Sequence, residues 1–367
     1  MTPSHDVVIV GGGAIGAACA RELSLAGRRV LVLEPGGHTG QAWRAAAGML
    51  APQIEAGDRD PLFELGLMGR DRYDVLATEL AETTGLDLGL WREGIARVAT
   101  DDVEGEALRS KVAWQRQEGH VCDWLDADEV RERWPWIGPV AGALWAPRDG
   151  ALDPGRLVTA LIADATRLGA RIVTDRAVRL DRSGSRIVGV TGRERYAAGE
   201  VIVAAGAWSA RLEGLPRPLS VEPVRGEMTA LPWPAGVRRS ILYNRDCYVV
   251  ARGDEALAGS TMEYAGFDAS VTEAGQRRIL ASARLLCPPL GVGTPLRSWA
   301  GLRPVTPDGL PLIGRAPDVD GLWYATGHGR NGILLAGVTG LAMAQMIAGE
   351  AAPDELAAAA PGRMWDW

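Results

Sequence analysis

The segment 7–34 places a glycine-rich turn between two apolar stretches near the start of the chain. Its first part, Val7–Val10, predicts a short buried strand, and Ala14–Leu25 has the 3.6-residue apolar period of a helix. The turn between them, GGGAIG at 11–16, matches the G-x-G-x-x-G pattern, and Arg29–Leu33 predicts a second strand. Strand, turn, helix and strand in this order predict a βαβ unit that binds an adenine dinucleotide.

The residues of this unit have separate tasks in the expected complex. Gly11 permits the tight turn, Gly13 lets a pyrophosphate approach the backbone at the helix N-terminus, and Gly16 allows close packing of helix on strand. Glu34 ends the second strand, where its carboxylate can accept hydrogen bonds from both hydroxyls of an adenosine ribose. The alternative is a glycine-rich turn of an unrelated α/β protein that binds no dinucleotide.

Composition excludes several classes of protein. The chain has 367 residues, which suits two domains, and ordinary hydrophobic (47%) and charged (23%) fractions. Its net charge of -7 argues against binding to nucleic acid or to a membrane surface. Because Lys111 is the single lysine, catalysis through a lysine Schiff base is not expected. The four cysteines and four histidines are dispersed, so neither a disulfide framework nor a metal site is predicted.

The ends of the chain bear on its location. The N-terminus runs into the first strand without a charged region and cleavage site, so we expect a cytoplasmic protein. The segment 332–349 has the length of a membrane span, but it contains Gln345 and many small residues. We therefore expect it to be a helix buried against the sheet.

The distribution of strand and helix signals predicts an α/β fold with two domains. Composition returns to glycine-rich turns and apolar runs after Trp299, and Leu219–Thr261 has the alternating pattern of a largely antiparallel sheet. We therefore expect a discontinuous Rossmann-like cofactor domain (1–86, 150–220 and 299–367) with an inserted substrate domain (87–149 and 221–298). The active site is expected at their junction.

Three motifs give the chain a resemblance to a known family. They are WAGLRPVTPDGLPLIG at 299–314, ATGHGRNGILLA at 325–336 and AAAGMLAPQ at 45–53. With them the chain resembles, over nearly its whole length, the thiamine-pathway glycine oxidases of the D-amino acid oxidase superfamily. The resemblance implies FAD as the dinucleotide. No cysteine lies between Trp299 and Gly314, so a covalent link to FAD, as in related sarcosine oxidases, is not expected.

The resemblance also implies which residues contact FAD. The helix that begins near 329–332 would direct its positive end toward the flavin ring, where it stabilises the negative charge of the reduced form. The implied cofactor residues are Gly11, Gly13, Ala14, Ile15, Gly16, Glu34, Ala46, Ala47, Gly48, Met49, Val178, Ala205, Gly206, Trp208, His328, Arg330, Asn331, Gly332 and Ile333.

The residues implied to bind substrate begin with Arg303, whose guanidinium can hold a carboxylate with two parallel hydrogen bonds. Tyr248 matches the second carboxylate contact, Met49 and Met262 match the pocket lining, and Arg330 borders the site. Each has a structural alternative: a loop arginine, a sheet aromatic, core methionines and a surface ion pair. One departure is Asp246, where the family has histidine. An acid there either favours a cationic amine or faces solvent.

The resemblance implies oxidative deamination of glycine or another small amino acid or amine. The α-carbon loses a hydride to flavin N5, and the imine hydrolyses to a 2-oxo acid and ammonia. Oxygen is the expected acceptor and yields hydrogen peroxide, and the expected role is thiamine thiazole biosynthesis. The alternatives are a sarcosine or D-amino acid oxidase, a dehydrogenase with another acceptor, and a non-oxidase FAD-binding or tRNA-modification module. A homo-oligomer is left open.

Overall fold

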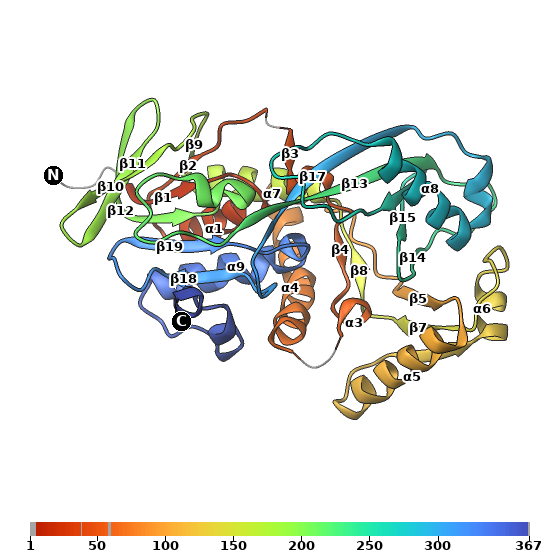
Figure 1. The fold of residues 1–367 in the computed structure, drawn as a ribbon. Coiled ribbons are helices and arrows are strands. Elements are labelled where there is room, and N and C mark those ends of the chain that lie inside the picture. Colours follow the sequence, from red (N-terminus) through yellow and green to blue (C-terminus); the bar gives the residue numbers. More distant parts are fainter. Residues whose placement is uncertain (1–4, 38, 58–59, 366–367) are drawn as a thin grey trace.

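The computed structural model describes residues 5–37, 39–57 and 60–365. Two large sheets lie next to one another in it, each with its own helices (Figure 1). The first sheet occupies the half of the molecule that contains the N-terminus, and the second occupies the other half. This arrangement confirms the predicted α/β class with a Rossmann-like part and a largely antiparallel sheet.

The first sheet contains the predicted βαβ unit. Its parallel part has the order β9-β2-β1-β12-β19. An antiparallel hairpin extends it at β12, and another strand pairs with β19. The strands are β1 (His5–Val10), β2 (Val30–Leu33), β9 (Arg171–Val173), β10 (Arg179–Ser183), β11 (Arg186–Thr191), β12 (Arg195–Val203), β18 (Leu312–Arg315) and β19 (Leu322–Thr326).

Helices α1 (Ala14–Leu25), α4 (Pro61–Thr84), α7 (Pro154–Arg167) and α9 (Gly332–Ile347) pack together beside this sheet. Local signals fix their ends. Asp153 accepts hydrogen bonds from the N–H groups of Gly155 and Arg156 and so caps α7, and Pro154 is its first residue, which is the sequence signature of a helix start. Helix α9 is the buried helix expected from the apolar segment 332–349. Among the described residues, no helix is long and apolar enough to span a bilayer.

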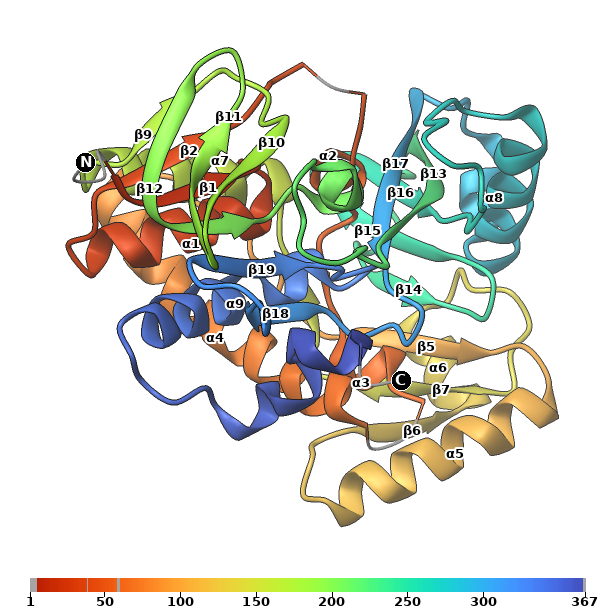
Figure 2. The ribbon, with the colours of Figure 1, turned by 60° about the vertical axis from the view of Figure 1, so that its left-hand side comes forward.

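The second sheet has the order β3-β17-β13-β16-β15-β14-β5-β7-β6 and is antiparallel except at β14·β5 and β17·β3. Its helices are α5 (Asp102–Gln117), α6 (Ala127–Arg133) and α8 (Glu273–Leu286), and α5 lies along β5, β6 and β7 (Figure 2). The strands are β3 (Gly40–Gln41), β5 (Ile95–Ala99), β6 (Asp123–Asp126), β7 (Gly142–Ala146), β13 (Glu222–Pro232), β14 (Ile241–Tyr243), β15 (Tyr248–Arg252), β16 (Glu255–Gly259) and β17 (Arg297–Val305).

Short elements connect the two sheets. Strand β4 pairs with β8, and α2 packs against both β17 of the second sheet and α7 beside the first. These connecting elements are α2 (Ala42–Ala45), β4 (Met49–Leu50), α3 (Pro52–Glu55), β8 (Gly150–Ala151) and the 3-10 helix η1 (Gly206–Arg211). Three further 3-10 helices pack on one side only: η2 (Pro288–Val292) on α8, and η3 (Asp354–Ala359) and η4 (Pro361–Trp365) on β18.

The sequence pattern divides one strand that the structure keeps whole. The pattern at 186–193 with 195–196 predicts a hairpin, and the mostly apolar run that begins at Glu200 predicts a separate strand, but 195–196 and 200–203 both belong to β12. The strand is continuous because its first half pairs with β11 and its second half with β1 and β19. The domain bounds stay a prediction. They do not follow the sheets everywhere, since β3 and residues 299–305 of β17 belong to the second sheet.

Candidate active site

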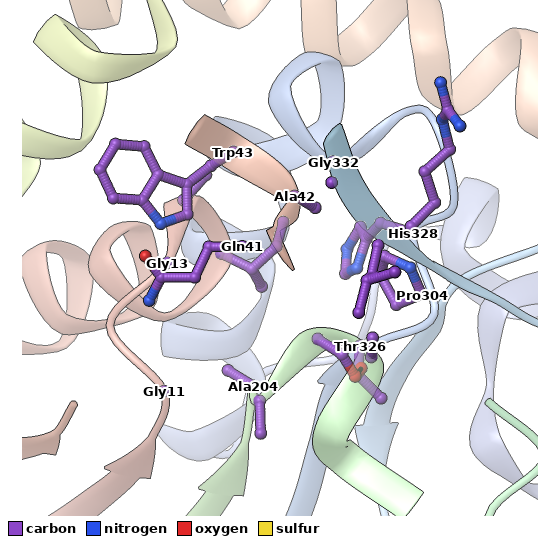
Figure 3. A pocket seen from close by; sticks show the side chains of 18 of the residues that line it. Gly11, Gly13, Gln41, Ala42, Trp43, Ala204, Pro304, Thr326, His328 and Gly332 are labelled. Atoms are coloured by element: carbon purple, nitrogen blue, oxygen red, sulfur yellow. Dashed lines mark hydrogen bonds between the residues drawn. The ribbon is translucent and has the colours of Figure 1, made fainter. Parts of the chain in front are cut away.

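A cavity of about 470 Å³ is lined by residues from both sheets and from the connecting elements. Gly11 and Gly13 border it from the first sheet, and Tyr248 and Arg303 border it from the second. Figure 3 shows Gln41 and Trp43 beside Gly13, with His328, Pro304 and Gly332 farther along the same pocket. The cavity therefore joins the predicted dinucleotide turn to the predicted substrate residues.

Two glycines of the turn occupy positions that a larger residue would disturb. Gly11 has φ +105°, and a Cβ built there would lie 2.5 Å from the carbonyl oxygen of Ala204. A Cβ on Gly16 would lie 1.9 Å from the carbonyl oxygen of Gly11, which matches the close helix packing predicted for it. In the described part of the chain, no side chain caps the N-terminus of α1. Its first N–H groups and the positive end of its dipole suit a pyrophosphate.

The carboxylate of Glu34 forms hydrogen bonds to the glycine-rich turn, and it also lines the cavity. Its Oε2 accepts a hydrogen bond from the Gly12 N–H at 2.7 Å, and its Oε1 accepts from the Gly36 N–H at 3.1 Å and from Gln41 Nε2 at 2.9 Å. Because a carboxylate oxygen has two acceptor sites, Oε2 keeps one for a ribose hydroxyl. The glycine turn, the uncapped helix and this acid together fit an adenine dinucleotide.

Arg303 is a partly buried cation on β17. Its Nη1 donates to the carbonyl oxygen of Thr261 at 3.0 Å, and its Nη2 donates to Ser260 Oγ at 2.7 Å. Burial lowers the pKa of Arg303 from its ordinary value. The side chain keeps its positive charge, because the ordinary pKa of arginine lies far above neutral pH. Within the described residues no carboxylate pairs with it, so a carboxylate ligand would supply the missing counter-charge.

Tyr248 lies on β15 and is 7% exposed. Its hydroxyl contacts Met228 Sδ at 3.1 Å, and burial raises the pKa of Tyr248. The phenol therefore stays protonated at neutral pH and can donate to an anion, because a thioether sulfur is only a weak competing acceptor. Its ring lies 5.8 Å from the ring of Tyr243, centroid to centroid.

Arg330 borders the same region from the loop before α9. Its Nη2 donates to Glu55 Oε1 at 2.9 Å and to the hydroxyl oxygen of Tyr243. The negative charge of Glu55 raises the pKa of Arg330. Arg303 and Arg330 thus differ in one respect: within the described ranges, Arg330 has a carboxylate partner and Arg303 has none.

His328 follows Gly327 in the same loop and is 2% exposed. Its Nε2 forms a hydrogen bond of 3.0 Å with Thr339 Oγ1, and its Nδ1 has no hydrogen-bond partner among the residues that the structure describes. Burial lowers the pKa of His328 to about 3, so the imidazole is neutral at physiological pH. A neutral ring adds no second positive charge beside the N-terminus of α9.

The structure brings most of the predicted site residues to this cavity. All the predicted cofactor and substrate residues line it except Gly16, which packs α1 on its strand, and Met262. Met262 is 54% exposed and does not line the cavity. Its neighbour Thr261 is buried and bonded to the Glu227 N–H and to Arg303, so the next side chain points outward. Asp246 faces solvent and not the cavity, which was one of its two expected placements.

Several cavity residues were missed from sequence. Gln41, Trp43 and Gly226 carried no motif of their own, and Ser260 lies in the turn after β16. Glu55 follows the motif at 45–53 by two positions, which is the one signal that pointed to it. No group of acidic, histidine and cysteine residues in the described part of the chain could hold a metal ion.

Known proteins with similar sequences and structures agree with a site for an adenine dinucleotide. Residues 6–346 match the family model described as FAD dependent oxidoreductase. The chain is 38% identical to a glycine oxidase of Geobacillus kaustophilus over 95% of this chain and 94% of that protein. The crystal structure of glycine oxidase from Geobacillus kaustophilus superposes with a TM-score of 0.92 at 35% identity, covering 99% of both chains. A bifunctional protein ThiO/ThiG of Synechocystis is 35% identical over 95% of this chain and 52% of that protein.

Proposed function

The chain belongs to the family of FAD-dependent oxidoreductases, and from this premise we propose that it oxidises glycine or another small amino acid. FAD is its cofactor. The proposed reaction converts the amino acid, oxygen and water to a 2-oxo acid, ammonia and hydrogen peroxide. Relatives named glycine oxidase, matched along almost their whole length, support this choice of substrate class.

The observation that carries the proposal is the pairing of Arg303 with Tyr248 in the cavity that begins at the dinucleotide turn. Arg303 has no carboxylate partner among the described residues, and Tyr248 is a protonated donor on the neighbouring part of the wall. A planar guanidinium binds a carboxylate with two parallel hydrogen bonds, and a phenol can add a third. The wall is thus complementary to the acid end of an amino acid.

The protein's part in the reaction is to position the substrate. Arg303 and Tyr248 hold the carboxylate, which fixes the position of the α-carbon relative to the cofactor. Bound FAD would accept the two electrons that leave the α-carbon, a task that amino-acid side chains do not perform here. A substrate that binds with a neutral amine needs no protein base.

Three wider features belong to the same proposal. The relatives named ThiO/ThiG, of which this chain spans about half, support a role in making the thiamine thiazole ring. We further propose oxygen as the acceptor, a cytoplasmic location and a homo-oligomer. The two-domain division at 1–86, 150–220 and 299–367 against 87–149 and 221–298 is proposed with them.

An aerobic panel of glycine, sarcosine and D-alanine tests the function. Glycine should give the highest kcat/KM, with equal amounts of hydrogen peroxide and 2-oxo acid. Higher turnover of sarcosine or D-alanine would identify the corresponding oxidase. Turnover only with an artificial electron acceptor, and no peroxide, would identify a dehydrogenase. If no amine reduces bound FAD, the chain is not an oxidase, and the FAD-binding or tRNA-modification alternative is supported.

A further inference from the structure

The two arginines at the substrate end of the cavity differ in charge balance. Arg303 donates to neutral oxygens of Ser260 and Thr261, whereas Arg330 donates to the carboxylate of Glu55. Arg303 therefore presents an unneutralised positive charge, while most of the charge of Arg330 is cancelled. A site with this arrangement has one place for a ligand carboxylate.

The two arginines are close enough to act on a single ligand. Arg330 donates a hydrogen bond to the hydroxyl of Tyr243, and the centroid of that ring lies 5.8 Å from the centroid of the Tyr248 ring. The positive charges of both arginines favour the ionised form of the Tyr248 phenol, and the negative charge of Glu55 favours the charged form of each arginine. A ligand held by Arg303 with a second acidic group on a short arm would bring that group to Arg330.

Hydrogen bonds hold the two residues before Glu55 in place, and this fixes the position of its carboxylate. Asp149 accepts from the Ile54 N–H at 2.9 Å. The side chain of Gln53 is bonded by Gln115 and Arg70, all of them buried. These contacts tie α3 to α4, α5 and the turn between β7 and β8. Glu55 is thereby fixed opposite Arg330 before any substrate arrives.

We propose that Glu55 is a specificity-determining residue: by occupying Arg330, it restricts the site to amines with a single carboxylate and excludes those with a second one. This inference rests on the proposed function, because it assumes that Arg303 holds the first carboxylate. A dicarboxylic amine would have to displace Glu55 from Arg330 or place its second carboxylate next to that of Glu55. Two like charges at that distance repel one another.

The test compares two unreactive ether acids bound to the FAD-loaded protein. Methoxyacetate has one carboxylate, and diglycolate has two and the shape of iminodiacetate. Their dissociation constants are measured from the change in flavin absorbance on titration. In Glu55→Gln, diglycolate should bind about tenfold more tightly than in the wild type, since its second carboxylate gains hydrogen bonds to a freed guanidinium. Methoxyacetate should change by less than about threefold.

A second variant separates the freed arginine from any general effect of the substitution. In Glu55→Gln combined with Arg330→Gln, the gain for diglycolate should disappear. Glu82→Gln removes an exposed carboxylate of α4 that does not line the cavity, and it should leave both constants unchanged. The ratio of kcat/KM for iminodiacetate to that for glycine should rise in Glu55→Gln in parallel with diglycolate affinity.

The outcomes distinguish this inference from the proposed function. Unchanged diglycolate binding in folded Glu55→Gln, with normal methoxyacetate binding, would overturn the role of Glu55 alone. Persistence of the gain in the double variant would overturn it too, because the gain would not come from Arg330. If methoxyacetate fails to perturb the wild-type flavin and glycine is not oxidised, the proposed function fails, and the role of Glu55 fails with it. Thermal unfolding of each variant identifies any loss of folding.

Discussion

The guanidinium of Arg303 lies directly over the backbone of Gly226. The two residues are on adjacent antiparallel strands, β17 and β13, and face the same side. A Cβ built on Gly226 would come 2.0 Å from Arg303 Nη1 and 2.3 Å from Cζ. The absence of a side chain at Gly226 therefore provides the space in which the proposed carboxylate anchor lies.

Gly226→Ala should reduce activity without unfolding the protein. The atoms that an added methyl group meets are the mobile end of Arg303, so the guanidinium moves rather than the strand. An alanine in a strand is intrinsically more favourable than glycine by roughly 0.5–1 kcal/mol, so stability should stay within about 1 kcal/mol of wild type. We expect kcat/KM for glycine to fall at least about tenfold, which corresponds to roughly 1.4 kcal/mol. Gly291→Ala, where an added Cβ meets nothing within 4 Å, is the control. Equal activity of the two variants would contradict the steric role of Gly226.

Tyr248→Phe should weaken substrate binding but retain turnover. The change removes one hydroxyl from a buried site and leaves the ring and its contact with Tyr243 in place. A hydrogen bond to a charged group contributes roughly 1.5–3 kcal/mol, so kcat/KM should fall about 10- to 150-fold. Steady-state kinetics with glycine measures this. An unchanged kcat/KM would show that the hydroxyl does not contact the carboxylate.

Gly11→Ala should lose FAD. The substitution forces a Cβ to within 2.5 Å of the Ala204 carbonyl oxygen at a backbone position with φ +105°. Gly27→Ala is the matched control, because its φ is +75° but nothing lies within 4 Å of the added Cβ. Flavin content after purification measures the loss of FAD, and the thermal stability of both variants measures the cost of the backbone strain. We expect Gly27→Ala to be destabilised by about 1 kcal/mol and still loaded. Comparable flavin content in the two variants would contradict the role of the turn.

The buried His328 should make stability fall at acid pH. Burial lowers its pKa to about 3, while an unfolded histidine titrates near its ordinary value of 6.5. Below pH 6.5 the unfolded chain binds a proton that the folded chain does not, so this contribution to stability is complete above pH 6.5 and is lost as pH falls toward 3. From pH 7.5 to 5 the loss from this one group is about 2 kcal/mol. His328→Gln should show a shallower decline in Tm over that interval, and an identical decline would contradict the assignment.

The parts of the fold that sequence predicted well depend on local signals. The βαβ unit could be recognised because its turn, helix period and strand ends lie within one short segment. The starts of α6 and α7 also have a local signal, because Asp126 and Asp153 cap the N–H groups two or three residues further on. The continuity of β12 was missed because it depends on three different partner strands, which no local pattern reveals.

The predicted site residues came from the three motifs and from the resemblance that these motifs establish. Arg303 and Arg330 lie in motifs, but their partners do not: Glu55 and Tyr243 are 275 and 87 residues away from Arg330 in sequence. The space at Gly226 depends on the register between β13 and β17, which the sequence does not specify. Met262 shows the converse, because a position matched through the resemblance points to solvent once the buried hydrogen bonds of Thr261 fix the segment.

Anaerobic mixing of the FAD-loaded protein with glycine tests the central claim most directly. In the wild type, glycine should bleach the visible flavin absorbance. Arg303→Ala should keep its FAD but be bleached slower by orders of magnitude, since a buried charged anchor contributes roughly 2–5 kcal/mol. Flavin that no small amino acid reduces, or an Arg303→Ala variant reduced as fast as the wild type, would contradict the account.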